Sequence, residues 1–317
     1  MSLQLKAARV AMRTLERTAP TLGAALAERL FFTPPRASLA PPVRDFLATG
    51  RAFRVCVEDG RVAAWAWGRG PAVALVHGWG GRGGRLATPF VAPLLASGFS
   101  VVTFDAPGHG DSDGTLSSMP QVARALRAVA DAAGSLFGII AHSMGGSASA
   151  LAMAQGLQVG RAVFIAPAAD PARFAEDFAT ALAVGPAAMA GMRRRSEARL
   201  RFRWSDLNVP RLATALDVPL LVVHDRDDPT VPWTEGAAIA AAWPGAELVT
   251  TTGLGHREVV RDPQVVARAV AFVRAGTPAA PLEAVPSAVS DEGAWLDRDL
   301  FEREGRRRRL FGISDTT

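Results

Sequence analysis

The stretch Ile139-Ile140-Ala141-His142-Ser143-Met144-Gly145-Gly146 decides the fold. Its apolar first half predicts a buried strand, and this strand runs directly into Ser143 and then into small residues that predict a helix. Such a serine has two interpretations. It is either a nucleophile at the junction of a strand and a helix, or an ordinary N-cap whose hydroxyl accepts a hydrogen bond from the first helical turn.

The same alternation of short apolar runs and helical patterns extends on both sides of this stretch. Asp59-Gly60 separates the first two runs and predicts a tight antiparallel hairpin. Continuous apolar strands separated by helices are typical of a mostly parallel sheet with helices on both faces. Eight strands are predicted at 53–58, 62–68, 72–76, 101–104, 137–141, 162–166, 220–224 and 248–251, and the intervening helices near 86–96, 120–132, 144–155, 234–242 and 263–274.

The pattern changes near both ends of the chain. Residues 1–50 predict two helices packed on the main domain and then a proline-rich linker, although the acid-poor first helix also fits a targeting peptide or a membrane-surface helix. Residues 51–276 form the main domain, and residues 277–317 predict a largely disordered tail with one short docking helix. About fifty residues separate two late strands, so we expect a small helical cap inserted at about 168–216.

Composition excludes several classes of protein. Apolar residues make up 49% of the chain and charged residues 21%, which is typical of a globular protein and excludes disorder throughout. A single cysteine, Cys56, allows no internal disulfide and no thiolate metal cluster. The net charge of +5 comes mainly from arginine, and we interpret the arginine-rich stretches at 193–203 and 306–309 as a solvated helix face and a charged tail, because no nucleic-acid-binding motif accompanies them.

The sequence around Ser143 resembles the nucleophile elbow of the α/β-hydrolases. In that family the serine occupies a strained turn, and the residues two before and two after it must be small, as Ala141 and Gly145 are; the first of them is usually glycine. The sequence Ala-His-Ser-Met-Gly-Gly is similar to the monoacylglycerol-lipase and serine-aminopeptidase branch. The resemblance covers roughly residues 53–275 and implies the α/β-hydrolase fold.

Two earlier loops support this resemblance. The segment His77-Gly78-Trp79-Gly80-Gly81 resembles the oxyanion loop of the family, which implies that the backbone N–H groups of Trp79 and Met144 stabilise the negative oxygen of a tetrahedral intermediate. A phosphate-binding loop is the alternative, but the Lys-Ser or Lys-Thr of a P-loop is missing. The segment at 104–112 resembles a structural turn of the family beside the active site.

The acid of a catalytic triad is expected in the loop after a late strand. Asp225, Asp227 and Asp228 compete for the role, and a helix-capping turn is the alternative for the whole loop. The resemblance selects Asp228, because the acid of the family stands four residues before the proline of an Asp-x-x-Val-Pro ending, here Pro232.

The histidine of the triad follows by elimination among the five histidines of the chain. Three of the others lie in structural loops or at a strand end, and the fourth adjoins Ser143 and is expected to point elsewhere; they are His77, His109, His224 and His142. His256 remains, in a glycine-flanked loop after the last strand. The order Ser143, Asp228, His256 matches the order of the α/β-hydrolases.

These residues predict a soluble, cytoplasmic serine hydrolase that cleaves a carboxylic ester of a small acyl substrate through an acyl-enzyme. A thioesterase, a perhydrolase and a C–C hydrolase use the same triad, and a binding protein that kept only the fold is the alternative of another class. No cofactor, metal or nucleic acid is expected, and docking on a membrane surface is the less favoured interpretation. The segment 174–192, with Trp79 and Trp233, indicates either an apolar acyl pocket or ordinary packing.

Overall fold

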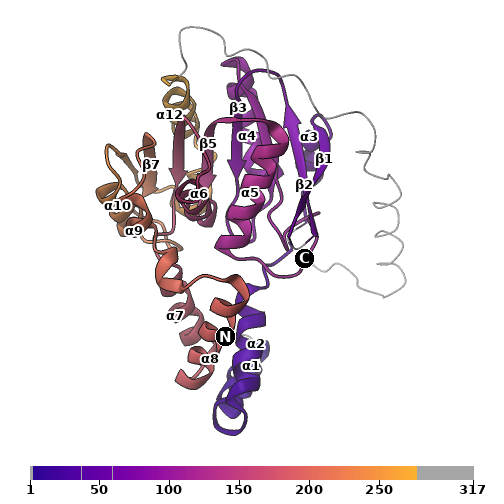
Figure 1. Ribbon diagram of the computed structural model, residues 1–317, viewed down its shortest axis with the longest axis vertical. Coiled ribbons are helices and arrows are strands. Elements are labelled where there is room, and N and C mark those ends of the chain that lie inside the picture. Colours follow the sequence, from indigo (N-terminus) through magenta and orange to yellow (C-terminus); the bar gives the residue numbers. More distant parts are fainter. Residues whose placement is uncertain (1–2, 37, 59, 277–317) are drawn as a thin grey trace.

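An eight-stranded sheet forms the centre of the computed structural model, which describes residues 3–36, 38–58 and 60–276 (Figure 1). The order across the sheet is β1-β2-β4-β3-β5-β6-β7-β8, and only β2 runs antiparallel to its neighbours. The predicted mostly parallel sheet is therefore confirmed. The strands are β1 (Arg51–Val57), β2 (Gly60–Trp67), β3 (Ala72–Val76), β4 (Ser100–Phe104), β5 (Leu136–His142), β6 (Arg161–Ile165), β7 (Leu220–Asp225) and β8 (Glu247–Thr251).

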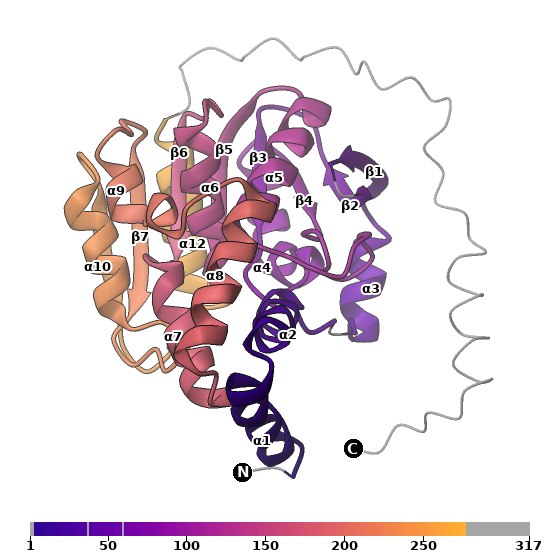
Figure 2. The same cartoon turned by 60° about the horizontal axis from the view of Figure 1, so that its bottom comes forward.

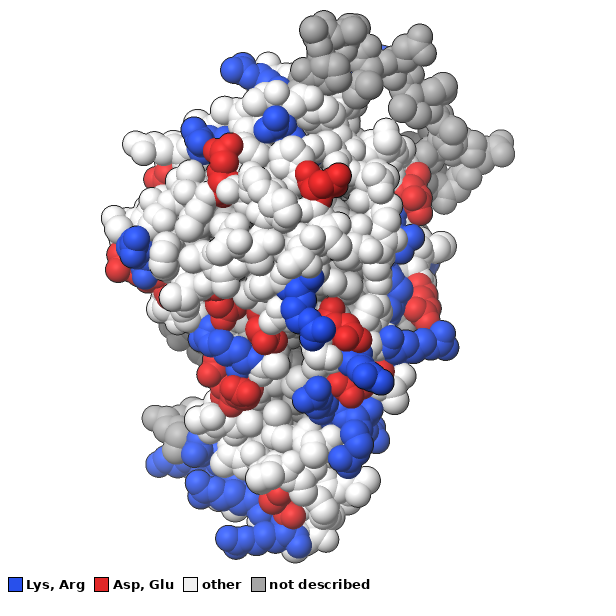
Figure 3. Space-filling view, turned by 60° about the vertical axis from the view of Figure 1, so that its left-hand side comes forward, with Lys and Arg blue, Asp and Glu red and all other residues white. Residues whose placement is uncertain are grey.

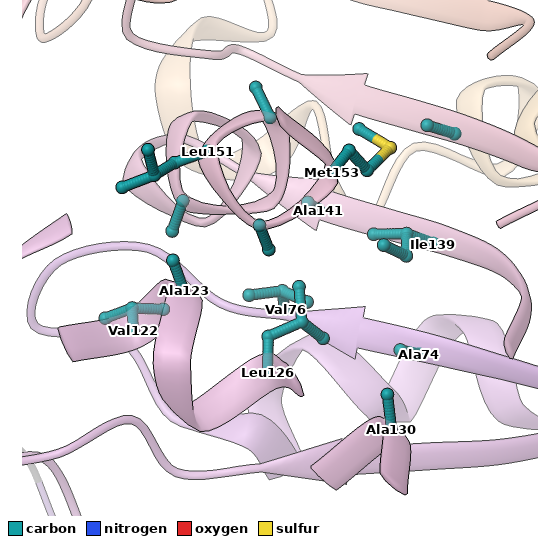
Figure 4. Close-up of a cluster of buried hydrophobic side chains, with 14 of the residues drawn as sticks. Ala74, Val76, Val122, Ala123, Leu126, Ala130, Ile139, Ala141, Leu151 and Met153 are labelled. Atoms are coloured by element: carbon teal, nitrogen blue, oxygen red, sulfur yellow. The ribbon is translucent and has the colours of Figure 1, made fainter. Parts of the chain in front are cut away.

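The central strands are apolar throughout because both of their faces are covered. In β3, Ala74 and Val76 point into one apolar layer, whereas Val73 and Leu75 point into the other. All four side chains are 0–1% exposed. Figure 4 shows the first of these layers, in which Leu126 of a covering helix lies over β3. This two-sided burial explains why the sequence shows continuous apolar runs instead of alternation.

Helices cover the two faces of the sheet. The first face carries α5 (Met119–Ala133), α6 (Met144–Ala154), α9 (Val209–Ala213) and α10 (Trp233–Ala242). The second carries α3 (Pro41–Leu47), α4 (Gly83–Ala96) and α12 (Pro263–Arg274). A short helix, α11 (Gly255–Glu258), follows the last strand.

A separate helical layer lies at one end of the sheet (Figures 1 and 2). It combines α7 (Pro171–Leu182), α8 (Pro186–Leu200) and the 3-10 helix η1 (Trp204–Leu207), inserted between β6 and β7, with α1 (Leu3–Thr18) and α2 (Pro20–Phe32). The layer has its own apolar core, to which Met12, Ala27 and Met192 contribute. The N-terminal helices were expected to pack on the main domain, but they pack on the inserted cap.

The contact between α2 and α8 is close because small residues line it. A Cβ added to Gly191 would lie 2.6 Å from the Cβ of Ala24, so a larger side chain would push the helices apart. Glu28 of α2 is 6% exposed, and its carboxylate accepts hydrogen bonds from the Nε–H groups of Arg195 and Arg199 at 2.8 and 2.9 Å. These two arginines were interpreted as part of a solvated helix face, and both are indeed exposed. The structure adds that they also hold α8 against α2.

The expected proline-rich linker also differs from the structure. Pro41 and Pro42 occupy the first turn of α3, where the missing N–H of proline costs nothing because the first amides of a helix have no acceptor within it. Leu47 is 4% exposed, and the Phe46 ring stacks on that of Trp67 with centroids 5.4 Å apart. The segment therefore fastens the N-terminal part to the sheet. The tail and docking helix predicted for residues 277–317 lie outside the described residues.

Candidate active site

Ser143 lies at the sharp junction between β5 and α6. Its φ of 54° and ψ of −127° fall outside the regions that residues other than glycine ordinarily adopt. The backbone N–H of Ser143 donates to the carbonyl of Ile165 at 2.9 Å, which fixes the turn to the neighbouring strand. The side chain makes no capping hydrogen bond to α6, so the N-cap interpretation of this serine does not hold.

Gly145 is required by the neighbouring strand. A Cβ at this position would lie 2.7 Å from the carbonyl oxygen of His77 and closer still to that of Val76, both of which are fixed backbone atoms. A small residue was expected here because of the strained turn at Ser143, and the atoms nearest to the added carbon belong to Val76 and His77 of the neighbouring strand and loop. The start of α6 is thus packed directly against the end of β3.

Asp228 and His256 form a closely hydrogen-bonded pair of side chains beside the cavity. The Nδ1 atom of His256 lies 2.7 Å from Oδ2 of Asp228, while Oδ1 accepts hydrogen bonds from the backbone N–H groups of Thr230 and Val231 at 2.8 and 2.9 Å. Burial alone would raise the pKa of Asp228, but hydrogen bonds from His224, His256 and these amides outweigh it and lower the pKa well below the ordinary value. Asp228 is therefore an anion at neutral pH.

The other two aspartates of this loop have different partners. Asp225 is fully buried and accepts hydrogen bonds from the hydroxyl of Thr251 and the N–H of Leu254, while Asp227 accepts from the N–H of Gly253 at 2.8 Å. Both carboxylates brace the loop that carries the histidine. Of the three candidates, Asp228 is the one that meets His256.

His142 contributes to the site in a way that the sequence did not indicate. Its Nε2 lies 2.9 Å from the backbone carbonyl of His256, and the two rings are 4.6 Å apart between centroids. Burial is the main cause that lowers the pKa of His142 to about 3, so the ring is neutral and donates from Nε2 to that carbonyl. The prediction that His142 points elsewhere is wrong: it lines the same cavity as Ser143 and supports the histidine loop.

The loop after β3 lies directly against Ser143. A Cβ on Gly78 would come within 2.8 Å of the Cβ of Ser143, so only glycine allows this approach. His77 ties the loop down, because its Nδ1 lies 2.7 Å from the Gly78 carbonyl and its Nε2 accepts from the N–H of Ala106 at 2.9 Å. Trp79 follows on the same loop and is 40% exposed at the rim of the cavity.

Met144 is the first residue of α6, and its N–H therefore has no carbonyl acceptor within the helix. The two residues predicted to supply oxyanion donors, Trp79 and Met144, line the cavity together with Ser143 and His256.

A cavity of about 970 Å³ opens in front of these residues. This volume lies at the upper end of the range of small-molecule sites. The cap contributes Phe174, Phe178 and Trp204 to its wall; the first two belong to the segment 174–192, for which a pocket and ordinary packing were both open. Trp233 has another role: it donates from Nε1 to the hydroxyl of Thr250 at 3.1 Å.

The N-terminal helix α2 also lines the cavity, which was not predicted. Leu30, Phe31 and Phe32 line it, and the Phe31 ring lies 5.2 Å from that of Phe178 and 6.2 Å from that of Trp204. A run of two phenylalanines at the end of a helix was the available signal, but it is equally typical of ordinary packing. The aromatic wall is therefore shared between two segments far apart in the chain.

Comparison with known proteins identifies the family to which this fold belongs. The model of the family described as alpha/beta hydrolase family matches residues 73–269, which is more than half of the chain. The chain belongs to the alpha/beta hydrolase family. The matched segment begins in β3 and ends in α12, so it contains Ser143, Asp228 and His256.

Curated relatives of this α/β-hydrolase match over shorter segments. A serine hydrolase-like protein of Danio rerio is 35% identical over 106 residues, which cover 31% of this chain and 32% of that protein. A pimeloyl-[acyl-carrier protein] methyl ester esterase of Methylococcus capsulatus is 53% identical over 45 residues, covering 14% and 17%. The chain thus spans about a third or less of the length of these two relatives.

Solved structures match over more of the chain. The esterase Pf2001 of Pyrococcus furiosus aligns with a TM-score of 0.57 at 19% identity and covers 77% of this chain and 98% of that one. At this identity the likeness concerns the fold alone.

Proposed function

We propose that this α/β-hydrolase is a serine esterase that cleaves carboxylic esters of apolar acyl groups, with Ser143 as nucleophile, His256 as general base and Asp228 as the acid that orients the histidine. The observation that carries the proposal is the 2.7 Å pair of His256 Nδ1 and Asp228 Oδ2, which lies in one cavity with a serine in a strained turn. Strain of this kind persists at functional sites because the surrounding structure holds it in place.

The chemistry follows from the protonation states. Because the Asp228 carboxylate is an anion, it accepts a hydrogen bond from the Nδ1–H of His256, and in the neutral imidazole the unprotonated nitrogen is then Nε2. Nε2 takes the proton of the Ser143 hydroxyl as the serine oxygen attacks the acyl carbon. The resulting imidazolium is stabilised by Asp228, and it then donates its proton to the departing alcohol.

The negative oxygen of the tetrahedral intermediate is stabilised best by hydrogen-bond donors that are already in position before the reaction. The backbone N–H groups of Trp79 and Met144 suit this role, because both residues line the cavity beside Ser143. Each such donor contributes roughly 3 kcal/mol to the stabilisation of the transition state. Water, activated by His256 in the same way, then hydrolyses the acyl-enzyme and restores the serine.

The wall of the cavity supports an apolar acyl group. Phe31, Phe174, Phe178 and Trp204 offer aromatic surface and no charge, and the volume of about 970 Å³ exceeds what a short acyl group fills. One of the relatives described above is named as a methyl ester esterase, which supports an ester over a thioester as the bond cleaved.

A series of p-nitrophenyl esters with acyl chains of increasing length tests the proposal. We expect hydrolysis by the wild-type chain, and a loss of at least about 10⁴-fold in kcat for Ser143→Ala, since the nucleophile is absent. Ser149→Ala is the matched control: Ser149 lies on the same helix, and its hydroxyl donates to the Gly145 carbonyl at 2.7 Å. Hydrolysis that persists unchanged in Ser143→Ala would refute the proposal.

A further inference from the structure

Helix α2 exposes an apolar stripe. Leu22, Leu26 and Leu30 are 64%, 36% and 42% exposed and follow one another at a spacing of four residues, which places them on one side of the helix. The opposite side, with Ala24 and Ala27, is buried against the cap. The helix therefore has two apolar faces, and only one of them is covered within the described residues.

This stripe continues to the mouth of the cavity. Leu30 lines the cavity, as does the exposed Trp79. Six large apolar side chains of the described residues are exposed, and four of them belong to α1 and α2. These four are the three leucines of the stripe and Val10 of α1, which is 62% exposed. Exposed apolar side chains gathered in this way mark an interaction surface, whereas single ones are ordinary.

The same two helices present positive charge outward. Arg29 lies three residues after Leu26, and Arg13 and Arg17 lie three and seven residues after Val10, so each shares a face with an exposed apolar side chain. Figure 3 shows Lys and Arg side chains gathered at the end of the molecule that carries the helical layer.

The acids of α1 and α2 are turned inward. Glu16 accepts hydrogen bonds from the N–H groups of Ala187 and Ala188 at the start of α8, at 2.8 and 3.0 Å. Glu28 is buried between two arginines, as described above. The outward face of these helices therefore combines leucine and arginine, while both glutamates are engaged by the cap.

We propose that this face of α1 and α2, which we call the docking face, binds an anionic lipid surface. Leucines that enter the interface and arginines that contact anionic headgroups are the combination by which helices lie on membranes. A second copy of the chain fits less well, because a symmetric contact would oppose like charges. None of the helices in the described ranges is long and apolar enough to cross a membrane.

Docking would place the mouth of the cavity at the lipid surface, because Leu30 belongs to the docking face and also lines the cavity. An acyl substrate held in the membrane could then enter without crossing water. This second step rests on the proposed function, whereas docking itself rests on the surface alone.

Co-sedimentation of the full chain with lipid vesicles tests the docking face. We expect binding to vesicles of phosphatidylcholine and phosphatidylglycerol, weaker binding to phosphatidylcholine alone, and a decrease as salt is added. The double variant Leu22→Gln/Leu26→Gln should lower the partition coefficient about thirtyfold, because two exposed leucines no longer enter the interface. Leu248→Gln is the matched control: Leu248 is 37% exposed on β8, away from the docking face, and its replacement should leave binding unchanged.

A charge variant separates the two contributions. Arg13→Gln/Arg17→Gln should lower binding about tenfold on anionic vesicles and leave binding to neutral ones nearly unchanged. Equal binding of wild type and both double variants would overturn the proposal. So would a dimer in solution that dissociates in Leu22→Gln/Leu26→Gln while no vesicles are bound.

Hydrolysis of p-nitrophenyl butyrate, measured without vesicles, keeps the two proposals apart. The two double variants of the docking face should retain this activity within about twofold, because the replaced side chains lie outside the cavity. Absence of hydrolysis by the wild type would contradict the esterase and leave the docking result intact, and hydrolysis without vesicle binding would do the reverse.

Discussion

Replacement of Asp228 by asparagine changes which ring nitrogen of His256 carries the proton. The loop itself should stay in place. Oδ1 of Asp228 accepts two backbone N–H groups, so the carbonyl oxygen of the asparagine will take that position and its NH₂ group will face His256. An NH₂ group cannot accept the Nδ1 proton. The imidazole must then carry its proton on Nε2, where it can no longer receive the proton of Ser143.

The expected cost is large and appears in kcat. The same change in a serine protease triad lowers kcat about 10⁴-fold, which corresponds to about 5.5 kcal/mol of activation free energy. Steady-state hydrolysis of p-nitrophenyl butyrate measures it, and the thermal unfolding midpoint checks that the fold is retained. We expect KM to change little, since Asp228 lies behind His256 and away from the aromatic wall.

Asp227→Asn is the matched control for this experiment. Asp227 precedes Asp228 in the same loop, and its carboxylate bonds to the N–H of Gly253 and not to His256. We expect less than about a tenfold loss. A variant Asp228→Asn with nearly normal kcat, together with a loss near 10⁴-fold in Asp227→Asn, would refute the assignment of the acid.

Three further perturbations follow from the structure. Gly145→Ala places a carbon against the fixed backbone at the end of β3 and should lower the free energy of unfolding by about 3 kcal/mol, measured by thermal unfolding. Gly146→Ala should cost less, because its added carbon meets the Phe164 side chain at 3.2 Å. Equal costs of the two variants would contradict this account of the turn. Phe31→Ala removes part of the aromatic wall and should lower kcat/KM about thirtyfold for a decanoyl ester but little for an acetyl ester; a uniform loss would place Phe31 outside the acyl site. Burial lowers the pKa of His77 from 6.5 to about 4 and the pKa values of His109 and His142 to about 3, so the unfolded chain binds protons that the folded chain excludes. Stability should be full above pH 7 and fall by about 2 kcal/mol for each of these histidines by pH 5. Urea denaturation at both pH values measures this, and a midpoint that rises on acidification would have the wrong sign.

Much of the fold was predictable because the central strands are covered on both faces. The fully buried β3 and β7 give apolar runs that interrupt the helical patterns, and the position of Ser143 directly after β5 follows from the same signal. The choice of Asp228 rested on the Asp-x-x-Val-Pro ending. That ending has a physical basis in the structure, since the N–H of Val231 is one of the two donors that hold the carboxylate.

The parts that failed depend on contacts between segments far apart in the chain. The pattern of α2 predicts a helix, but nothing in it specifies α8 as the partner or the cavity as the place where Phe31 lies. His142 was set aside because its neighbour faces the site, yet its ring reaches the carbonyl of His256 more than a hundred residues away. The arginines of α8 are exposed, as predicted, but their ion pairs with Glu28 could not be predicted, because Glu28 belongs to a distant helix.

Labelling with a fluorophosphonate probe tests the nucleophilic role of Ser143 most directly. The probe reacts with a serine whose hydroxyl is activated by a neighbouring base, so we expect one modified site, mapped by mass spectrometry to the peptide that contains Ser143. The label should be lost in Ser143→Ala and strongly slowed in His256→Ala. Labelling that persists in Ser143→Ala, or that maps to another residue of the wild-type chain, would contradict the proposed triad.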